Sequence, residues 1–182
     1  MKYPRQEKIV NEKSRGRIYV TGGVRDYLQR RYDVDPSKDI VFYSYVSNSV
    51  VPSQLRRKIS EKDGETHIVY IWTATSRIKD DHYDLREIFR ILASYGIHTH
   101  MYVSIWGAKD QAYPRLANES AFIHYHGHLD QKSLLQEIMQ YDFGWACFNE
   151  NSKNRDILMY PCQTKLSILR AVFPLLRFHI KT

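Results

Sequence analysis

Short apolar runs alternate with helix-length amphipathic segments along residues 67–174 of this 182-residue chain. A short apolar run bounded by turn residues is typical of a buried strand, and apolar residues spaced three or four apart are typical of a helix. The expected strands lie at 67–72, 98–103, 122–125, 143–147 and 175–178, and the expected helices at 83–95, 108–118, 131–139 and 165–172. This alternation predicts an α/β fold with a parallel sheet flanked by helices. Such sheets bind ligands beyond the carboxyl ends of their strands, so function is expected in the loops that follow the apolar runs.

The amino-terminal part of the chain follows a different pattern. Residues 1–17 are polar and rich in Lys, Arg and Glu, which predicts either a frayed lead-in or the cut end of something larger. A strand is expected at 18–20, a helix at 24–31 and a second strand at 39–45. Residues 48–65 lack a strong apolar period and are interpreted as a linker. The predicted organisation is therefore an end segment (1–47), a linker (48–65) and a main domain (66–182).

Three residues mark the expected ends of helices. Asp81 and Asp130 stand where helix N-caps belong, because an Asp side chain can accept hydrogen bonds from the free N–H groups of the first turn. Gly96 follows the long helix, where a left-handed glycine commonly stops a helix. The expected helices thus begin or end at residues that favour the start or the end of a helix.

The charge of the chain favours anionic partners. The formal net charge is +7 and the pI is about 9.3, which suits a nucleotide diphosphate, a nucleic acid or an acidic membrane surface. The basic runs Arg30-Arg31 and Arg56-Arg57-Lys58 lack interleaved exposed aromatics, and no RNA-binding signature is present, so no nucleic-acid partner is expected.

The cysteines and the apolar tail indicate where the chain resides. Cys147 and Cys162 lack CxxC spacing, which is consistent with buried thiols and with a reducing, cytoplasmic compartment. The apolar stretch 171–180 is interrupted by Pro174, Arg177 and His179, so it is not expected to cross a membrane. Peripheral attachment to the anionic inner face of a membrane is a further expectation, because each basic residue near such lipid contributes about 1 kcal/mol.

Four segments in order resemble the GT-B glycosyltransferases, and in particular glycosyltransferase family 4. They are YVTGGVRDYL (19–28), FIHYHGHL (122–129), YDFGWA (141–146) followed by FN (148–149), and PCQTK (161–165) with the helix up to Pro174. No single segment is diagnostic, and the order and spacing of all of them carry the resemblance. It covers roughly residues 18–176.

The resemblance implies the carboxyl-terminal half of a GT-B fold, which is Rossmann-like. Residues 1–47 would be the end segment of an acceptor domain, and 66–182 an incomplete donor domain for a nucleotide sugar such as a UDP- or GDP-sugar. The implied reaction is retaining transfer of a hexosyl group to a polysaccharide or glycoconjugate. The chain would then be a fragment, a split subunit that works with a separate acceptor-domain subunit, or a degenerate copy. The alternative is a non-catalytic module that binds a nucleotide or a protein partner.

Six residues are candidates for donor binding, and none is assigned a catalytic role. Arg77 and Lys79 follow the first donor-domain strand and resemble the family's paired cations for the leaving diphosphate; the alternative is a solvated turn. Lys165 opens a helix after a proline-containing loop, where a cation and free N–H groups would meet a phosphate; the alternative is ordinary surface charge.

The remaining three candidates would contact the base and the sugar. Gly127 lacks a Cβ and would let a nucleobase approach the backbone, although a strand-ending turn explains it equally well. Asn149 and Asn154 follow the next strand and would hydrogen-bond sugar hydroxyls. The alternative is that they stabilise turns, which is the usual role of asparagine in a loop.

Histidines at alternate positions raise the possibility of a metal site. His98 and His100, and likewise His124, His126 and His128, would each point to one face of a strand. The first pair is expected at the start of its strand, and His126 and His128 at the end of theirs, which would place them at opposite ends of the sheet. No metal and no other cofactor are therefore expected, and the resembled family does not generally need a metal.

One departure from the family pattern bears on activity. The family usually places a Glu on the helix after the Pro and Lys, where it holds the ribose hydroxyls. Here no acidic residue occurs from Ile157 to Thr182, and Val172 replaces the Gly of the following turn. Loss of a carboxylate that accepts two hydroxyls should weaken donor binding by about 1.5–3 kcal/mol.

Overall fold

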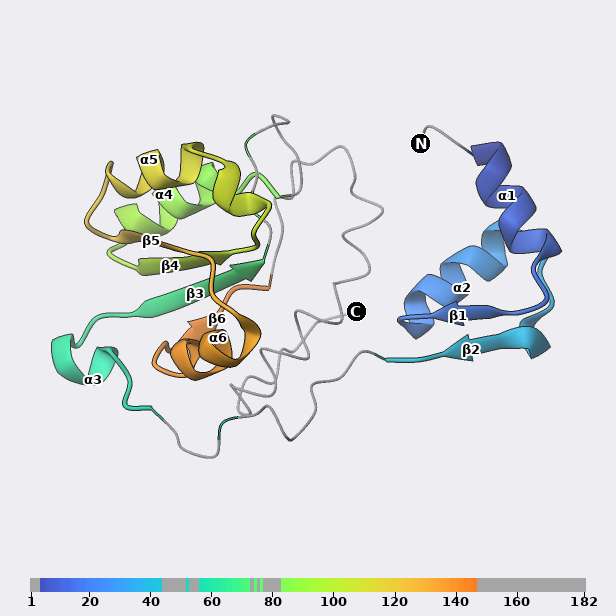
Figure 1. The fold of residues 1–182 in the computed structure, drawn as a ribbon, viewed down its shortest axis with the longest axis horizontal. Helices are drawn as coiled ribbons and strands as arrows, with labels where there is room; N and C mark the ends of the chain where they lie inside the picture. Colours follow the sequence, from blue (N-terminus) through green and yellow to red (C-terminus); the bar gives the residue numbers. More distant parts are fainter. Residues whose placement is uncertain are drawn as a thin grey trace. The chain divides into compact units, whose positions relative to one another are not determined.

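The computed structural model describes residues 4–43, 52, 56–72, 74, 76 and 83–146. The chain divides into two compact units, Met1–Tyr45 and Val46–Thr182 (Figure 1). Among the described residues, none of the helices combines the length and apolar character that a membrane span requires.

The first unit is a two-stranded parallel sheet with helices. Its elements are α1 (Pro4–Lys13), β1 (Arg17–Tyr19), α2 (Gly22–Arg31), η1 (Pro36–Lys38) and β2 (Asp39–Val41). The prediction of a frayed lead-in at 1–17 is wrong, because α1 occupies most of it. Helix α1 carries a polar sequence with little apolar periodicity, so the amphipathic signal that identifies helices is weak there.

Two local interactions shape the first unit. Thr21 caps α2, since its side chain accepts a hydrogen bond from Val24 N at 3.0 Å. Arg17 and Asp39 are register partners in β1 and β2, and their side chains form a nearly buried ion pair at 2.6 Å. The pair fixes the register at the start of both strands.

The second unit contains a four-stranded, all-parallel sheet with strand order β5-β4-β3-β6. Its elements are α3 (Ser60–Asp63), β3 (His67–Trp72), α4 (Arg86–Ser94), β4 (His98–Val103), η3 (Gly107–Lys109), α5 (Ala112–Ala117), β5 (Ile123–Gly127), α6 (Gln131–Ile138) and β6 (Phe143–Gly144). The predicted fold class, a Rossmann-like parallel sheet flanked by helices, is confirmed.

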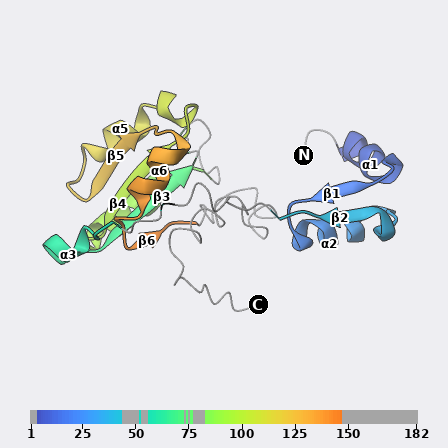
Figure 2. The same cartoon turned by 60° about the horizontal axis from the view of Figure 1, so that its bottom comes forward.

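Helices cover both faces of this sheet (Figures 1 and 2). Helices α4 and α5 pack on one face, where Phe89 and Leu116 are fully buried against Tyr70. Helix α6 packs on the other face and buries Leu135 and Ile138. Alternate residues of each strand therefore serve two separate core layers, as expected for a strand buried on both sides.

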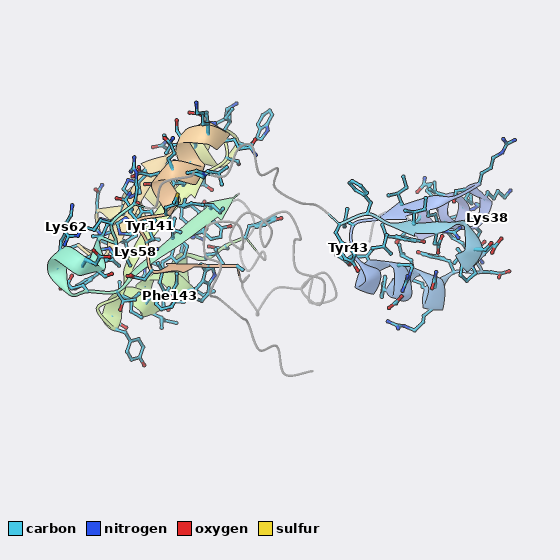
Figure 3. The ribbon with its side chains drawn as sticks, turned by 90° about the horizontal axis from the view of Figure 1, so that it is seen from below. Lys38, Tyr43, Lys58, Lys62, Tyr141 and Phe143 are labelled. Atoms are coloured by element: carbon cyan, nitrogen blue, oxygen red, sulfur yellow. The ribbon has the colours of Figure 1, made fainter. Side chains whose placement is uncertain are left out.

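The end of the predicted linker belongs to the second unit. Residues 60–63 form α3, and Ile59 N donates to Gln140 O at 2.9 Å. The Lys58 ammonium donates to the backbone oxygen of Met139 at 2.8 Å and also to that of Tyr141, beside which it lies in Figure 3. Burial lowers the pKa of Lys58, and these carbonyls supply the partners that a partly buried ammonium needs.

Most predicted boundaries in the second unit agree with the structure to within a few residues. The expected helix at 108–118 is instead two pieces, η3 and α5, interrupted at Asp110. Asp130 caps α6 as predicted, and Gly96 has the left-handed φ of 70° that a helix stop requires. Asp81, the helix at 165–172 and the strand at 175–178 lie outside the described residues, and the domain ranges remain predictions.

Candidate functional site

The strand order places a topological switch point between β3 and β6. From β3 the chain proceeds to β4 and then β5 on one side, and it returns through α6 to β6 on the other side of β3 (Figure 1). In open parallel sheets, ligands bind in the crevice at the carboxyl ends of the two strands where the direction reverses. The carboxyl edge of β3 and β6 is therefore the candidate site.

The loops that leave β3 and β4 pack closely at this edge. A Cβ built on Gly107 would lie 3.2 Å from Val103 Cβ and 3.3 Å from the Ala74 backbone oxygen. Ala74 and Gly107 are both buried. These distances are tighter than most Cβ contacts, so a side chain at position 107 would require the neighbouring loop to shift by a few tenths of an ångström.

A carboxylate ties the same two loops together. Asp110 accepts a hydrogen bond from Ser76 N at 2.6 Å and another from the Ser76 hydroxyl at 2.9 Å. It also accepts one from Ala112 N at 3.0 Å, which starts α5. Burial raises the pKa of Asp110, but hydrogen bonds from the Ser76 and Ala112 N–H groups outweigh it, so the pKa is lowered overall. The carboxylate is ionised at neutral pH and holds the β3 loop in place.

The end of β5 contributes a tight turn to this edge. Gly127 has a φ of 76°, which side-chain-bearing residues rarely adopt, so the turn itself explains the glycine. His128 Nδ1 donates to Val103 O at 3.1 Å and joins this turn to the end of β4. Asp130 then accepts from Lys132 N and Ser133 N at 3.0 and 3.1 Å and starts α6.

Trp145 lies directly after β6 at the switch point. Its backbone N–H donates to Val69 O at 2.8 Å, which extends the pairing of β6 with β3. Its indole Nε1 is buried and has no hydrogen-bond acceptor among the described residues. Buried donors in proteins are nearly always satisfied, so this N–H is available to a group from outside the described part of the chain.

The structure describes one of the six predicted donor-binding residues. Gly127 lies at the carboxyl edge, at the end of β5, and its contact with a nucleobase remains a prediction. Five others lie outside the described residues: Arg77, Lys79, Asn149, Asn154 and Lys165.

The sequence interpretation overlooked residues that build the edge itself. They are Ser76, the neighbouring pair Gly107 and Asp110, and Trp145, three positions that lie far apart in the sequence and that no motif links. The signal that could have identified them is the occurrence of Gly107 and Asp110 soon after the strand expected at 98–103, because Gly and Asp often form the turns that follow a strand.

The predicted separation of the histidines is wrong. In the β4–β5 register His100 pairs with His124, and His100 Nδ1 lies 3.0 Å from His126 Nε2. In this register Ile123 lies opposite Thr99 and Tyr125 lies opposite Met101, so β5 runs alongside β4 from near its start. Among these described histidines, His128 is the one that bonds to the end of β4. His67, His98, His100 and His124 lie in the first halves of their strands, and His126 lies farther along β5, where its ring stacks on that of Tyr102 with centroids 4.6 Å apart.

Comparisons with known proteins add a weak structural similarity. No family model and no curated protein matches the chain. A crystal structure of TarM aligns with 77% of this chain at 15% identity and a TM-score of 0.48. A mutant of S. aureus TarM in complex with fondaparinux, alpha-GlcNAc-glycerol and UDP aligns with 91% at 12% identity and a TM-score of 0.46. The chain spans 26% and 38% of these two chains, and both TM-scores are too low to support an assignment of function.

Proposed function

We propose that this chain is the donor-side half of a nucleotide-sugar-dependent glycosyltransferase, with the nucleotide diphosphate at the carboxyl edge of β3 and β6. The observation that carries the proposal is the strand order β5-β4-β3-β6, which creates a switch point at that edge. The resemblance of the sequence to glycosyltransferase family 4 supplies the class of ligand.

The sequence supplies cations next to this switch point. In the sequence, Arg77 and Lys79 come after β3 and Asn149 comes after β6, the two strands that flank the switch point. The anchoring of Ser76 by Asp110 fixes the loop immediately before Arg77. A diphosphate needs cationic and N–H donors, and a loop held at its base presents them with little ordering cost.

Hexosyl transfer also needs an acceptor held against the donor sugar. We propose that an acceptor-domain subunit supplies this surface, because positioning of the two substrates is a large part of what such an enzyme contributes. Turnover is then expected only when that subunit is present.

A second candidate function is a nucleotide-binding module without turnover. The absence of acidic residues from Ile157 to Thr182 favours it, since the family's ribose-binding Glu has no counterpart there. Both candidates share nucleotide binding and differ only in product formation.

The test is a thermal-shift and calorimetric titration of the full chain with UDP, GDP and their sugars. Binding to the native state raises the melting temperature progressively with ligand concentration. The variant R77A/K79A should bind at least tenfold more weakly, because hydrogen bonds to charged groups contribute about 1.5–3 kcal/mol each. Sugar transfer, assayed with a candidate acceptor-domain subunit, separates the enzyme from the module.

The matched control is R57A/K62A, which removes the same charge from the segment that precedes β3. Arg57 pairs with Glu61 at 2.9 Å, and both precede β3 in the chain. Lys62, labelled in Figure 3, lies on α3, which also precedes β3. This variant should bind like the unmodified chain. No stabilisation by any of the ligands, or equal losses in both double variants, would contradict the proposed site.

A further inference from the structure

Histidines from three adjacent strands form a continuous cluster in the second unit. The histidine cluster comprises His67 of β3, His98 and His100 of β4, and His124 and His126 of β5. The rings of His67 and His98 stack with centroids 4.5 Å apart, and those of His100 and His124 stack at 4.3 Å. The cluster lies on the face that α6 covers, since His100 also contacts Tyr141 at 4.5 Å.

Three of these side chains have ring nitrogens that lie close together. His67, His98 and His100 each present a ring nitrogen, and these atoms all lie within 4.8 Å of one another. His67 Nδ1 and His100 Nε2 are 2.9 Å apart. Zinc–nitrogen bonds of about 2.0–2.1 Å place tetrahedral ligand atoms roughly 3.3 Å apart, which is close to the spacing of this set. The stacked rings of His67 and His98 must turn out of their parallel arrangement for both nitrogens to reach one metal ion.

Two carboxylates face the outer nitrogens of the same rings. Asp63 Oδ2 lies 3.1 Å from His67 Nε2, and a carboxylate oxygen of Glu65 contacts His98 Nε2. Metal-ligating histidines usually donate their second N–H to a carboxylate, which fixes the tautomer and strengthens the ligand. With the ring proton on Nε2, toward the carboxylate, each neutral ring has the lone pair of Nδ1 available: His67 Nδ1 faces His100 Nε2, and His98 Nδ1 faces His124 Nε2.

The environment disfavours the charged form of three rings in the cluster. Burial, followed by the neighbouring imidazoles, lowers the pKa of His100 to about 2. Burial also lowers the pKa of His124 and His126.

We propose that the histidine cluster binds a divalent first-row transition metal such as Zn²⁺ through His67 Nδ1, His98 Nδ1 and His100 Nε2. His124 Nε2, which is 2.8 Å from His98 Nδ1, stands next to this set. The protons balance in neutral rings: His67 and His98 keep theirs on Nε2 toward the carboxylates, and His100 keeps its own on Nδ1 toward His126 Nε2. Imidazole ligands select zinc, nickel and copper over magnesium and calcium, which take oxygen ligands.

The competing explanation is a hydrogen-bonded ladder of histidines without metal. If every ring carries its proton on Nε2, His126 donates to His100, which donates to His67, which donates to Asp63. That arrangement also satisfies the rings, and it predicts no affinity for metal. The two explanations therefore differ in a measurable quantity.

The experiment is a calorimetric titration of Zn²⁺ into the untagged full chain after treatment with a chelator and dialysis. The expected result is one Zn²⁺ per chain, and Co²⁺ in its place should give the visible absorption of a nitrogen-ligated site. His100→Gln should weaken binding at least 100-fold. Asp63→Asn should weaken it about 10- to 100-fold, because it changes only a carboxylate that orients a ligand.

His128→Gln is the matched control, since His128 donates to Val103 O at the opposite edge. It should bind Zn²⁺ like the unmodified chain. Asp63 is exposed, so Asp63→Asn remains informative if His100→Gln fails to fold. Absence of Zn²⁺ binding up to millimolar concentration, or equal binding by the unmodified chain and Asp63→Asn, would overturn the proposal in favour of the ladder.

Discussion

At the scale of single residues, Asp110 decides how the loops at the carboxyl edge are held. It is the shared acceptor for Ser76 and for the first N–H of α5. Its lowered pKa means that the folded state prefers the ionised carboxylate more than the unfolded chain does. The stabilisation is therefore fully present above the carboxyl's unfolded pKa and is lost as the pH falls through the folded pKa.

We expect Asp110→Asn to reduce the free energy of unfolding by about 0.5–1.5 kcal/mol at pH 7, because an amide has one acceptor oxygen in place of two. The variant should also lose less stability than the unmodified chain between pH 6 and pH 3. Urea unfolding followed by tryptophan fluorescence at several pH values measures both effects.

Ser76→Ala provides a graded comparison for Asp110. It removes the hydroxyl donor and retains the Ser76 N–H, so its loss of stability on acidification should fall between those of the unmodified chain and Asp110→Asn. Identical acid sensitivity in all three proteins would show that Asp110 does not carry this linkage.

At the scale of elements, α6 is the described helix that covers the face of the sheet bearing the histidine cluster. It begins at the Asp130 cap and buries Leu135 and Ile138 against Val69 and Ile71. The opposite face has both α4 and α5. The packing of this face therefore depends on few side chains, and each should matter strongly.

Leu135→Ala should lower the free energy of unfolding by about 2–5 kcal/mol, because it leaves a cavity at a site that is 1% exposed. Leu134→Ala makes the same chemical change on a partly buried neighbour and should cost clearly less. Denaturant unfolding at neutral pH compares the two. Equal losses would mean that α6 does not pack as described.

At the scale of the whole molecule, the two units differ in how much core they have. Among described residues of the first unit, the buried hydrophobic side chains are Tyr19 and Tyr32, whereas Ile18, Ile40 and Phe42 are more than half exposed. The second unit contains both extended core clusters. A unit of this small size gains little from burial and should have low stability.

We therefore expect the units to unfold at different denaturant concentrations. Trp72, Trp106 and Trp145, which are all the tryptophans, belong to the second unit, so their fluorescence reports that unit alone. Far-UV circular dichroism reports both units and should begin to change at lower urea concentration. Coincident transitions would indicate a single cooperative structure.

Much of the fold could be predicted from the sequence because its determinants are local. The ranges of β3 and β4 follow from the alternation of apolar and amphipathic segments. The start of α6 follows from the side-chain oxygen of Asp130, and the end of α4 from the positive φ that Gly96 adopts. Helix α1 and the break at Asp110 were not predictable in this way. The first lacks an apolar period, and the second depends on a hydrogen bond to Ser76, thirty-four positions away.

The sequence by itself determined the α/β class, the order of the elements and the loops in which ligand-binding residues should be sought. Only the tertiary structure decided the position of β6 beside β3, and with it the switch point. The tertiary structure also decided the strand register that brings His126 next to His100. The same register places histidines of three strands together, two of them beside the carboxylates that precede β3. Periodicity along a chain sets which face a side chain takes, whereas pairing between distant strands sets which side chains meet there.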